Sequence, residues 1–336
     1  MMKSVLFTEK NAPIIVGEIA EPICKHDEVV IAIKASALNH RDLWISKGMY
    51  AKIAYPVTPG SDGCGIIIQS NSSQFPIGKR IVINPNVNWG DNQEFQSKEY
   101  TVLGMPTQGT MAQMIAVPEH RIHAAPEHLT DIQAAGLPLA GLTAFRAVCT
   151  KGDIKPGQNI LITGIGGGVA LTAMQFAIAI GANVYCTSGS QEKLNKAIAL
   201  GAKNGVLYNQ PNWHKTLMSM CEDGFDCVID SAGGDQWNEL AQILKPSGKL
   251  VFYGATLGDV HQFNLQRLFW KQITICGTTM GSDDEFSAML AFVEHHKIVP
   301  IIDSVFTFDA APEAFEYMHH GKQFGKIVLN HEVMDQ

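Results

Sequence analysis

The chain has 336 residues, of which 46% are hydrophobic, and its formal net charge is −7. This length exceeds one ordinary core, so it predicts two domains or one large α/β unit of ordinary globular composition. No run of Lys or Arg is longer than two residues. A nucleic-acid surface needs clustered basic charge, and we therefore expect no nucleic-acid partner.

Three features bear on compartment and membrane. The N-terminus has only a brief apolar stretch before Glu9 and Lys10, which is too short for a signal peptide. The stretch from Ile160 to Cys186 has no charge, but a glycine cluster inside it favours a strand, a turn and a buried helix over a membrane span. Seven Cys without a C-x-x-C spacing indicate a reducing, cytoplasmic setting.

The first stretch of the chain, to about residue 124, predicts many short strands. Apolar runs at 29–33, 65–68 and 77–83 are closely punctuated by Gly, Pro and Asn. This pattern is typical of a small barrel-like domain.

Beyond Pro126 the pattern changes to alternating strands and helices. A helix is predicted to start within 129–135. After it we expect strands at 159–163, 183–187, 225–230 and 249–253, with helices at 169–180 and 191–200. Such alternation predicts a parallel sheet with helices on both faces. From about Thr278 the pattern is mixed, with helices expected at 286–296 and 312–320 and a closing strand at 326–329.

A glycine cluster stands between the first of these strands and its helix. Residues 164–170 read GIGGGVA, in the strand–turn–helix context that a dinucleotide-binding fingerprint requires. Glycine allows a tight turn and a close approach to a pyrophosphate, and the helix N-terminus offers free N–H groups. We expect the cofactor phosphates to lie against Gly164, Gly166, Gly167, Gly168 and Val169.

The end of the next strand predicts which dinucleotide binds. An NAD-preferring site places Asp or Glu there to bind the ribose hydroxyls. Here residues 184–190 contain no acid, and the first acid is Glu192. Ser188 can donate a hydrogen bond to a 2′-phosphate and Lys193 can supply positive charge, so we expect NADPH/NADP+. The alternative is that Lys193 is a solvated helix residue.

Five segments, taken in order, resemble the motifs of the medium-chain dehydrogenase/reductase superfamily, and in particular its zinc-independent quinone oxidoreductases. They are Ala37 to Leu43, Pro59 to Gly65, Leu139 to Ala144, Cys276 to Gly281 and Gly325 to Leu329. The resemblance implies an α/β protein with a GroES-like, β-barrel-type catalytic domain (1–124 and 277–336). It also implies a Rossmann doubly wound parallel sheet domain (125–276), which often forms a homodimer. It implies further cofactor contacts from Thr143, Gly254, Thr278, Met280 and Lys326.

The resemblance also bears on zinc. Zinc alcohol dehydrogenases of this superfamily hold a catalytic ion with Cys, His or Glu, and Cys, and the corresponding positions here look like Asn39, Ser61 and Leu139. These residues cannot supply three ligands of the kind that zinc needs. We therefore expect no metal, although His40, Asp62 and Cys64 remain an improvised alternative.

Without a Lewis acid, simple aldehydes and alcohols are hard substrates, whereas quinones and enones delocalise the charge that hydride addition creates. The protein must then donate hydrogen bonds to the developing oxyanion. Asn39 is the first candidate donor, Tyr50 and His40 are further candidates, and Asp42 is expected to orient its neighbours. Tyr50 could equally be a packed aromatic, and His40 a surface histidine.

The sequence therefore predicts an NADPH-dependent oxidoreductase that reduces quinones, enones or related conjugated carbonyls by hydride transfer without zinc. An atypical metal-assisted alcohol or aldehyde dehydrogenase and a non-catalytic NADPH-binding protein remain alternatives. The substrate is not identified, because the segments expected to line its site, 49–52 and 86–104, are of the variable kind. Segment 86–104 is open to two interpretations, a substrate lid or the remnant of a zinc lobe.

Overall fold

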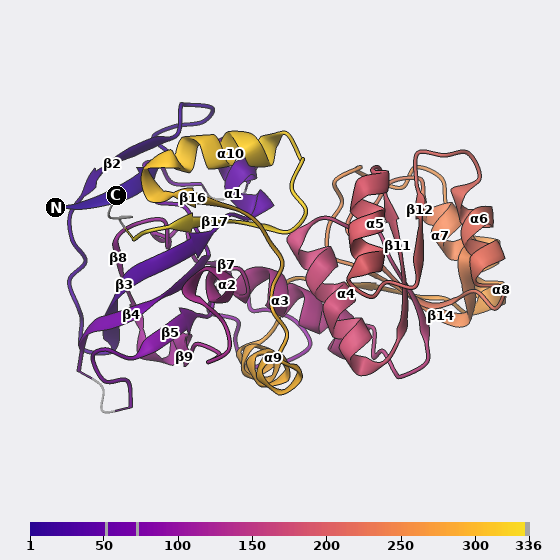
Figure 1. Cartoon of the computed structure of the whole chain (residues 1–336), viewed down its shortest axis with the longest axis horizontal. Coiled ribbons are helices and arrows are strands. Elements are labelled where there is room, and N and C mark those ends of the chain that lie inside the picture. Colours follow the sequence, from indigo (N-terminus) through magenta and orange to yellow (C-terminus); the bar gives the residue numbers. More distant parts are fainter. Residues whose placement is uncertain (51–52, 72–73, 333–336) are drawn as a thin grey trace. The chain divides into compact units, whose positions relative to one another are not determined.

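The computed structural model describes residues 1–50, 53–71 and 74–332. The chain forms two compact units, Met1–Leu139 with Ser282–Gln336, and Ala140–Gly281 (Figure 1). The sequence placed the divisions earlier, after residues 124 and 276. The first division falls later because helix α2 (Asp131–Ala135) packs against strands β3 (Glu28–Ala37) and β4 (Asp62–Ser70) of the first unit.

The first unit is built on a mainly antiparallel sheet of seven strands in the described part of the chain. Its order is β16-β17-β3-β4-β5-β9, and β8 also pairs with β3. The further bounds are β5 (Arg80–Ile83), β8 (Met114–Pro118), β9 (Ile122–Ala124), β16 (Ile302–Thr307) and β17 (Lys326–Asn330). Strand β5 begins at Arg80, so the predicted run 77–83 is a strand only in its second half.

Two smaller strand pairs complete the β-structure of this unit. Strands β1 (Met2–Leu6) and β2 (Ile15–Ile19) pair antiparallel, as do β6 (Asn86–Val87) and β7 (Thr101–Val102). Alternate residues of β3, among them Val29, Ile31 and Ile33, are buried in one core cluster. Since burying such a side chain contributes about 1.5–3 kcal/mol, this period-two pattern fixes which face of β3 turns inward.

Short helices connect and cover this sheet. They are α1 (His40–Ser46), α2, α9 (Asp283–His296) and α10 (Ala311–His319), and α3 (Pro138–Phe145) contains the division between the units. Helix α9 starts three residues before the predicted Phe286, because the Ser282 hydroxyl accepts the Glu285 N–H and the Glu285 carboxylate accepts the Ser282 N–H in return. In Figure 1, α10 lies across β16 and β17.

The second unit is a six-stranded parallel sheet with the order β12-β11-β10-β13-β14-β15. The strands are β10 (Asn159–Ile162), β11 (Asn183–Ser188), β12 (Asn204–Leu207), β13 (Phe225–Asp230), β14 (Leu244–Phe252) and β15 (Thr274–Gly277). Its helices are α4 (Gly168–Ile180), α5 (Gln191–Ala199), α6 (Trp213–Met220), α7 (Trp237–Ile243) and α8 (Leu265–Lys271). This is the doubly wound order, in which the strand order reverses between β10 and β13 while the strands stay parallel. The predicted fold class is therefore confirmed.

Helix α4 shows why the uncharged stretch after Ile160 is not a membrane span. The helix has 13 residues and ends at Gly181, which adopts φ 95°, a left-handed conformation that glycine reaches at little cost. Its apolar residues are needed on most sides because it packs on β10 and β11 and also on the helical segment Arg146–Lys151. In the described part of the chain, no helix is both long and apolar enough to cross a bilayer.

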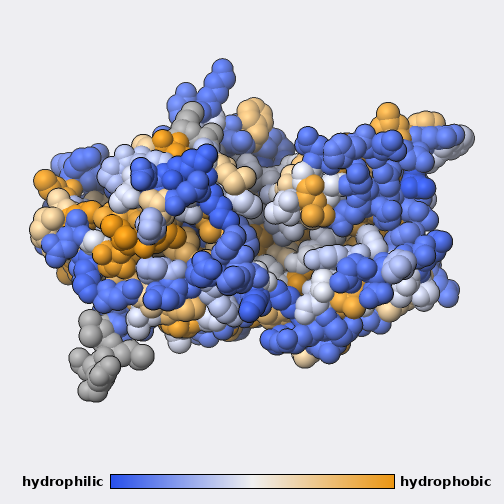
Figure 2. All heavy atoms as spheres, turned by 90° about the horizontal axis from the view of Figure 1, so that it is seen from above, coloured by the Kyte–Doolittle hydropathy of each residue, from blue (hydrophilic) through white to orange (hydrophobic). Residues whose placement is uncertain are grey.

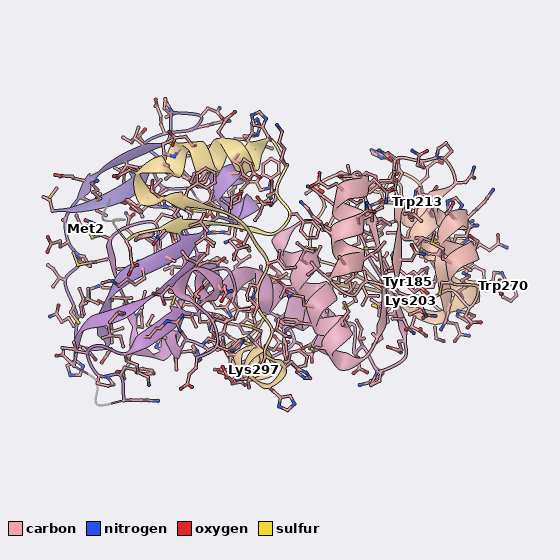
Figure 3. The ribbon with its side chains drawn as sticks, in the orientation of Figure 1. Met2, Tyr185, Lys203, Trp213, Trp270 and Lys297 are labelled. Atoms are coloured by element: carbon pink, nitrogen blue, oxygen red, sulfur yellow. The ribbon has the colours of Figure 1, made fainter. Side chains whose placement is uncertain are left out.

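Aromatic side chains fill the core of the second unit. Tyr185 of β11 meets Phe225 of β13 edge-on at 5.3 Å between ring centres, and the Lys203 ammonium lies 5.9 Å from the Tyr185 ring centre (Figure 3). Trp213 closes the same cluster. The surface is different: the face of the molecule in Figure 2 is mainly hydrophilic, with hydrophobic side chains gathered in limited patches.

Candidate functional site: a glycine turn and a buried polar network

The glycine cluster forms the tight turn that joins β10 to α4 in the second unit. Gly164 and Gly166 adopt φ 63° and 132°, which side chains with a Cβ rarely tolerate. A Cβ on Gly166 would lie 2.9 Å from Cδ of Lys193 and 3.5 Å from its Nζ, whereas one on Gly167 would meet nothing within 4 Å. Gly167 precedes Gly168 and Val169, which open α4. The backbone N–H groups of this first turn are therefore available to an anion.

The end of β11 brings several polar groups beside this turn. Ser188 is buried, and its hydroxyl donates to the carbonyl of Ile165 (3.4 Å) and accepts from the backbone N–H of Ser190 (3.2 Å). Lys193, in the first turn of α5, reaches over Gly166. The structure thus brings Ser188 and Lys193 to the glycine turn, and the Lys193 ammonium supplies positive charge there.

Tyr208 is a residue of this region that the sequence did not suggest. It follows β12, and its hydroxyl oxygen lies 2.7 Å from where a Cβ on Gly189 would stand. About half of the Tyr208 side chain is exposed. The pairing of Ser188 with Leu207 sets this position, and sequence periodicity alone does not reveal such a register between strands.

Asp230, at the end of β13, organises the same edge of the sheet. Its carboxylate is fully buried and accepts hydrogen bonds from the Thr163 hydroxyl (2.5 Å), the Gly233 N–H (2.8 Å) and the Trp237 indole (3.0 Å). It therefore ties the end of β10, which leads into the glycine turn, to the start of α7. The sequence contained a signal for it, an acid as the last residue of a buried strand.

The remaining predicted cofactor residues of the second unit are Thr143, Gly254, Thr278 and Met280. The Thr143 hydroxyl donates to the Met280 sulfur at 3.6 Å, and both side chains are buried. A Cβ on Gly254 would come within 2.7 Å of the Ser231 carbonyl oxygen, so this position requires glycine. The Thr278 hydroxyl is buried with no hydrogen-bond partner among the described residues, as expected of a group that meets a ligand. The turn, the charge and this hydroxyl together fit a dinucleotide.

In the first unit, three side chains from distant segments meet in a buried network. Lys326 opens β17, Asp62 opens β4, and Asn39 directly precedes α1. The Lys326 ammonium donates to the carbonyl oxygen of Leu38 (2.9 Å), to Oδ1 of Asn39 (2.6 Å) and to Oδ2 of Asp62 (2.9 Å). Nδ2 of Asn39 donates to the same Asp62 oxygen (2.9 Å), and the backbone N–H of Leu139 donates to Oδ1 (2.7 Å).

This geometry bears on the prediction that Lys326 binds the cofactor. An ammonium has three N–H donors, and the three bonds to Leu38, Asn39 and Asp62 use them all. The Lys326 side chain is 5% exposed. These contacts favour a structural partnership with Asn39 and Asp62 over a direct bond to a phosphate.

Arg41 anchors the segment that follows β6. Its guanidinium donates to the Ser61 hydroxyl (2.7 Å) and to the Leu103 carbonyl (2.9 Å), and it lies 5.2 Å from the ring centre of Tyr50. Tyr50 is 41% exposed, which is compatible with either of its predicted roles. Ala51 and Lys52, which the sequence placed beside it, lie outside the described residues.

Segment 86–104 folds back on itself, and strands β6 and β7 pair near its two ends. Trp89 is 2% exposed and packs edge-on against Tyr100 at 5.3 Å. The Tyr100 hydroxyl donates to Oδ1 of Asn86 (3.1 Å). Its own small core distinguishes this segment from an unstructured loop, and neither predicted interpretation of it is decided by these contacts.

His40 and Asp42 stand on either side of Arg41 in α1. His40 is exposed, yet desolvation by the surrounding protein and, second, the Lys326 ammonium lower its pKa. Asp42 is fully buried, and burial raises its pKa against the opposing effects of Arg41 and the Asn39 N–H. Its carboxylate accepts that N–H at 2.9 Å. Asp42 thus holds the backbone of Asn39, in agreement with the orienting role expected of it.

The donor set at the zinc-ligand positions does not fit a metal ion. Asn39 is engaged with Lys326 and Asp62, Ser61 donates to the Leu103 carbonyl (2.8 Å), and Leu139 has no ligand atom in its side chain. Among the described residues, no group of three His, Cys, Asp or Glu is placed to hold an ion. Of the improvised set, the Asp62 carboxylate is already engaged by Lys326, by the Asn39 amide and by the Leu139 N–H.

Comparisons with known proteins agree with this architecture. The family model of the alcohol dehydrogenase GroES-like domain matches residues 25–127, and that of the zinc-binding dehydrogenase matches residues 168–295. The chain is 37% identical to the zinc-type alcohol dehydrogenase-like protein YogA of Leptosphaeria maculans over 94% of each chain. It is 27% identical to the quinone oxidoreductase of Homo sapiens over 98% of each chain.

A solved structure supports the same assignment. The protein described as an NAD-dependent alcohol dehydrogenase superposes with a TM-score of 0.93 at 31% identity, over 98% of this chain and 100% of that one. Likeness of this extent, in sequence and in fold, spans both units. The chain therefore belongs to the medium-chain dehydrogenase/reductase superfamily of oxidoreductases.

Proposed function

We propose that this protein is an NADPH-dependent oxidoreductase that reduces quinones, enones or related conjugated carbonyls by hydride transfer without zinc. One observation carries the proposal: a buried ammonium, Lys326, is bonded to Asn39 at the position of a zinc ligand. A cation that is already in place, beside an amide, disfavours a second cation there. The amide instead offers a hydrogen-bond donor.

The residues of the first unit act on the substrate oxygen. Bound NADPH supplies the hydride. An N–H of Asn39 donates to the carbonyl oxygen as negative charge develops on it, and one such donor is typically worth about 3 kcal/mol in the transition state. Conjugation spreads the same charge, which is why quinones and enones suit a site without a Lewis acid. Tyr50 or His40 supplies the proton that completes the reduction. The lowered pKa of His40 leaves little of its imidazole protonated near pH 7, which favours Tyr50 for this role.

Coenzyme choice follows from the end of β11. Ser188, Lys193 and Tyr208 surround the position where an NAD-preferring site would place an acid. We propose that Lys193 and the Tyr208 hydroxyl bind the 2′-phosphate of NADPH. The related structure described as NAD-dependent makes a direct comparison of the two coenzymes necessary.

The deciding experiment measures initial rates of NADPH and NADH oxidation with a panel of quinones and enones in the presence of a chelator. We expect turnover with a clear preference for NADPH. Turnover that returns only when a metal is added would favour an atypical metal-assisted alcohol dehydrogenase. Tight NADPH binding without turnover on any electrophile would favour a non-catalytic binding protein.

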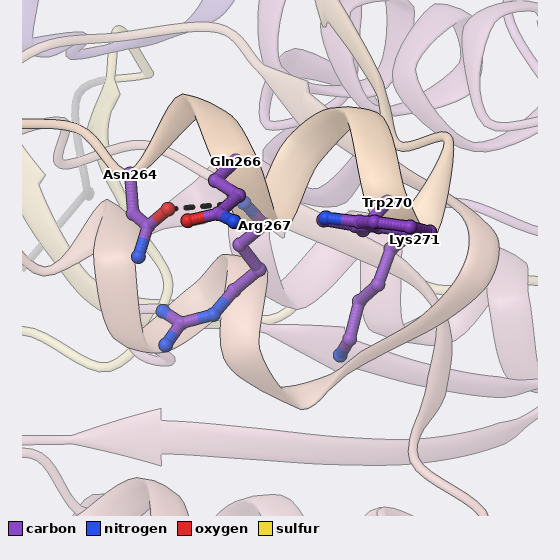
Figure 4. Close-up of a pocket in the computed structure, with 5 residues that line it drawn as sticks. All are labelled: Asn264, Gln266, Arg267, Trp270 and Lys271. Carbon is purple, nitrogen blue, oxygen red and sulfur yellow. Dashed lines mark hydrogen bonds between the residues drawn. The ribbon is translucent and has the colours of Figure 1, made fainter.

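We also propose a homodimer formed through the sheet of the second unit. Strand β15 is the last strand in the sheet order. Beside it, α8 exposes Phe269 and Trp270 by 64% and 73%, next to a surface hollow lined by Asn264, Gln266, Arg267, Trp270 and Lys271 (Figure 4). An open strand edge with exposed aromatics is suited to pairing with a second copy.

The dimer is tested by light scattering after gel filtration. Trp270→Glu is expected to convert a dimer to a monomer. Ile23→Glu changes an apolar residue of the first unit that is even more exposed (83%) and should leave the mass unchanged. A wild-type chain that elutes as a monomer would refute the proposal.

A further inference from the structure

The Asn39 amide is held by groups that permit only one orientation. Its side chain lies between the Lys326 ammonium, which can only donate, and the Asp62 carboxylate, which can only accept. The amide must therefore turn Oδ1 toward Lys326 and Nδ2 toward Asp62. A flipped amide would set Oδ1 against a carboxylate oxygen and Nδ2 against an ammonium, two repulsive contacts in place of two attractive ones.

Burial makes this preference strong. Asn39, Asp62 and Lys326 are 8%, 0% and 4% exposed, so water cannot replace the lost bonds. The rest of the pair is satisfied as well: Asp62 also accepts the Leu139 N–H, and Lys326 also donates to the Leu38 carbonyl. Because of these additional bonds, neither the Asp62 carboxylate nor the Lys326 ammonium can move with the Asn39 amide if the amide rotates.

The backbone at Asn39 is fixed independently of its side chain. The Asp42 carboxylate accepts the Asn39 N–H at 2.9 Å, and the Thr110 hydroxyl, which donates to the Asp62 carbonyl (2.7 Å), secures the opposite strand. The Nδ2 group has two hydrogens, of which one is directed at Asp62. Among the described residues, the second has no partner.

We infer that Lys326 and Asp62 are positioning residues that lock the flip state of the Asn39 amide, so that an N–H and never a C=O faces the substrate oxygen. The inference rests on the function proposed above, in which Asn39 is the donor. It assigns to Lys326 a task other than cofactor binding. It also explains why the network uses an ion pair, because neutral partners could accept either orientation.

The test uses a variant that keeps the charge balanced and therefore avoids a lone buried ion. In Asp62→Asn/Lys326→Met both ions are gone, and the Leu139 N–H keeps the oxygen of the new amide at the Oδ1 position. The NH₂ end of the new amide then faces Asn39, and the wild-type orientation of Asn39 loses its preference. With a quinone substrate and saturating NADPH we expect kcat to fall about 100-fold, as for loss of an oxyanion donor. KM should change less than about threefold, and NADPH affinity, measured by fluorescence, should stay within about twofold.

Four further variants, one of them a control, identify the cause of this loss. Lys326→Arg keeps a cation and should recover about tenfold of the lost rate. Asn39→Ala should match the pair variant, and the triple variant should be no worse than Asn39→Ala alone, since all act through one amide. Lys297→Met alters an exposed lysine that pairs with Glu294 and should behave as wild type. A pair variant with wild-type kcat, or a loss that adds in full to that of Asn39→Ala, overturns the inference.

A readout that needs no turnover separates this inference from the proposed function. The side-chain NH₂ signals of Asn39 in a ¹⁵N-correlation spectrum are identified by their loss in Asn39→Ala. In wild type they should be well separated from free amide values, and in the pair variant they should move toward them. Unchanged signals overturn the inference whatever the kinetics show. A wild-type enzyme that reduces no quinone overturns the proposed function, and the spectra then still decide whether Lys326 and Asp62 hold Asn39.

Discussion

The glycine turn of the second unit offers backbone groups to a ligand, whereas the buried network of the first unit is made of side chains. The turn contributes backbone: a few consecutive residues adopt conformations open to glycine, and the first N–H groups of α4 have no partner within the helix. The network contributes side chains from three segments, up to 287 residues apart along the chain, and its two charges pair with each other inside the protein. The first kind of site has little effect on stability, whereas the second is part of the core.

The largest effect should come from unbalancing the network. Lys326→Met leaves the Asp62 carboxylate buried without its cation, and we expect the free energy of unfolding to fall by about 3–5 kcal/mol. Urea unfolding at pH 7 measures it. The charge-balanced pair variant, Asp62→Asn/Lys326→Met, should recover most of this loss. If Lys326→Met were as stable as wild type, the buried network would not contribute to the stability of the core.

A substitution in the glycine turn should have the opposite effect. NADPH binding should weaken strongly, while the free energy of unfolding stays constant. A side chain at Gly167 meets nothing within 4 Å, so Gly167→Asp should fold, and its carboxylate even suits a helix N-terminus. The same carboxylate repels the phosphates, and the Kd for NADPH should rise at least about 100-fold. Gly167→Ala is the matched control and should bind within about threefold of wild type. Unaltered binding by the Asp variant would refute the cradle.

Coenzyme preference should change by a smaller factor. Lys193→Ala removes the charge over Gly166, so the Kd for NADPH should rise about tenfold, near the strength of one charge-assisted bond. The Kd for NADH, which has no 2′-phosphate, should stay constant. Tyr208→Phe tests the residue that the sequence did not suggest and should weaken NADPH alone, about threefold. An equal rise in Kd for NADPH and for NADH would mean that these residues do not contact the 2′-phosphate.

The smallest effect concerns acid sensitivity in the first unit. Nε2 of His331 and the Ser36 hydroxyl share a hydrogen bond (2.8 Å). Desolvation lowers the pKa of His331 to about 3. The folded protein therefore holds the imidazole neutral. The contribution of the neutral imidazole to the free energy of unfolding is complete above pH 6.5 and is lost as the pH falls toward 3. His331→Gln should remove about 1 kcal/mol of the stability difference between pH 7.5 and 5.5. Identical pH dependence in urea unfolding would contradict the assignment.

The same contrast explains what the sequence could predict. The cradle was predictable because its residues are contiguous and each responds to a local requirement, such as the left-handed φ of Gly164 or the helix start at Gly168. The alternation of strands and helices after Pro126 likewise predicted a parallel sheet, and the doubly wound order confirms it. Local pattern is sufficient where neighbouring residues supply the cause.

Other features depend on pairing between distant segments. Lys326 belongs to a motif suggestive of cofactor contact, but its bonds run to Asn39 and Asp62, which only the β17–β3–β4 arrangement brings near. Tyr208 reaches Gly189, just after β11, through the β11–β12 register, and Asp230 reaches Thr163 through its place in β13. Since a one-residue change of register would remove each of these contacts, composition and periodicity could not reveal them.

Lys326 also has a consequence for the order in which the protein is made. It is synthesised 264 residues after Asp62, roughly 15–50 s later at ordinary rates of translation. Until it emerges, the carboxylate that opens β4 has no cation to pair with, and β3 lacks its β17 neighbour. The second unit, which is continuous in sequence, can complete its sheet during that interval. The domain that begins first on the ribosome is therefore the one that finishes last.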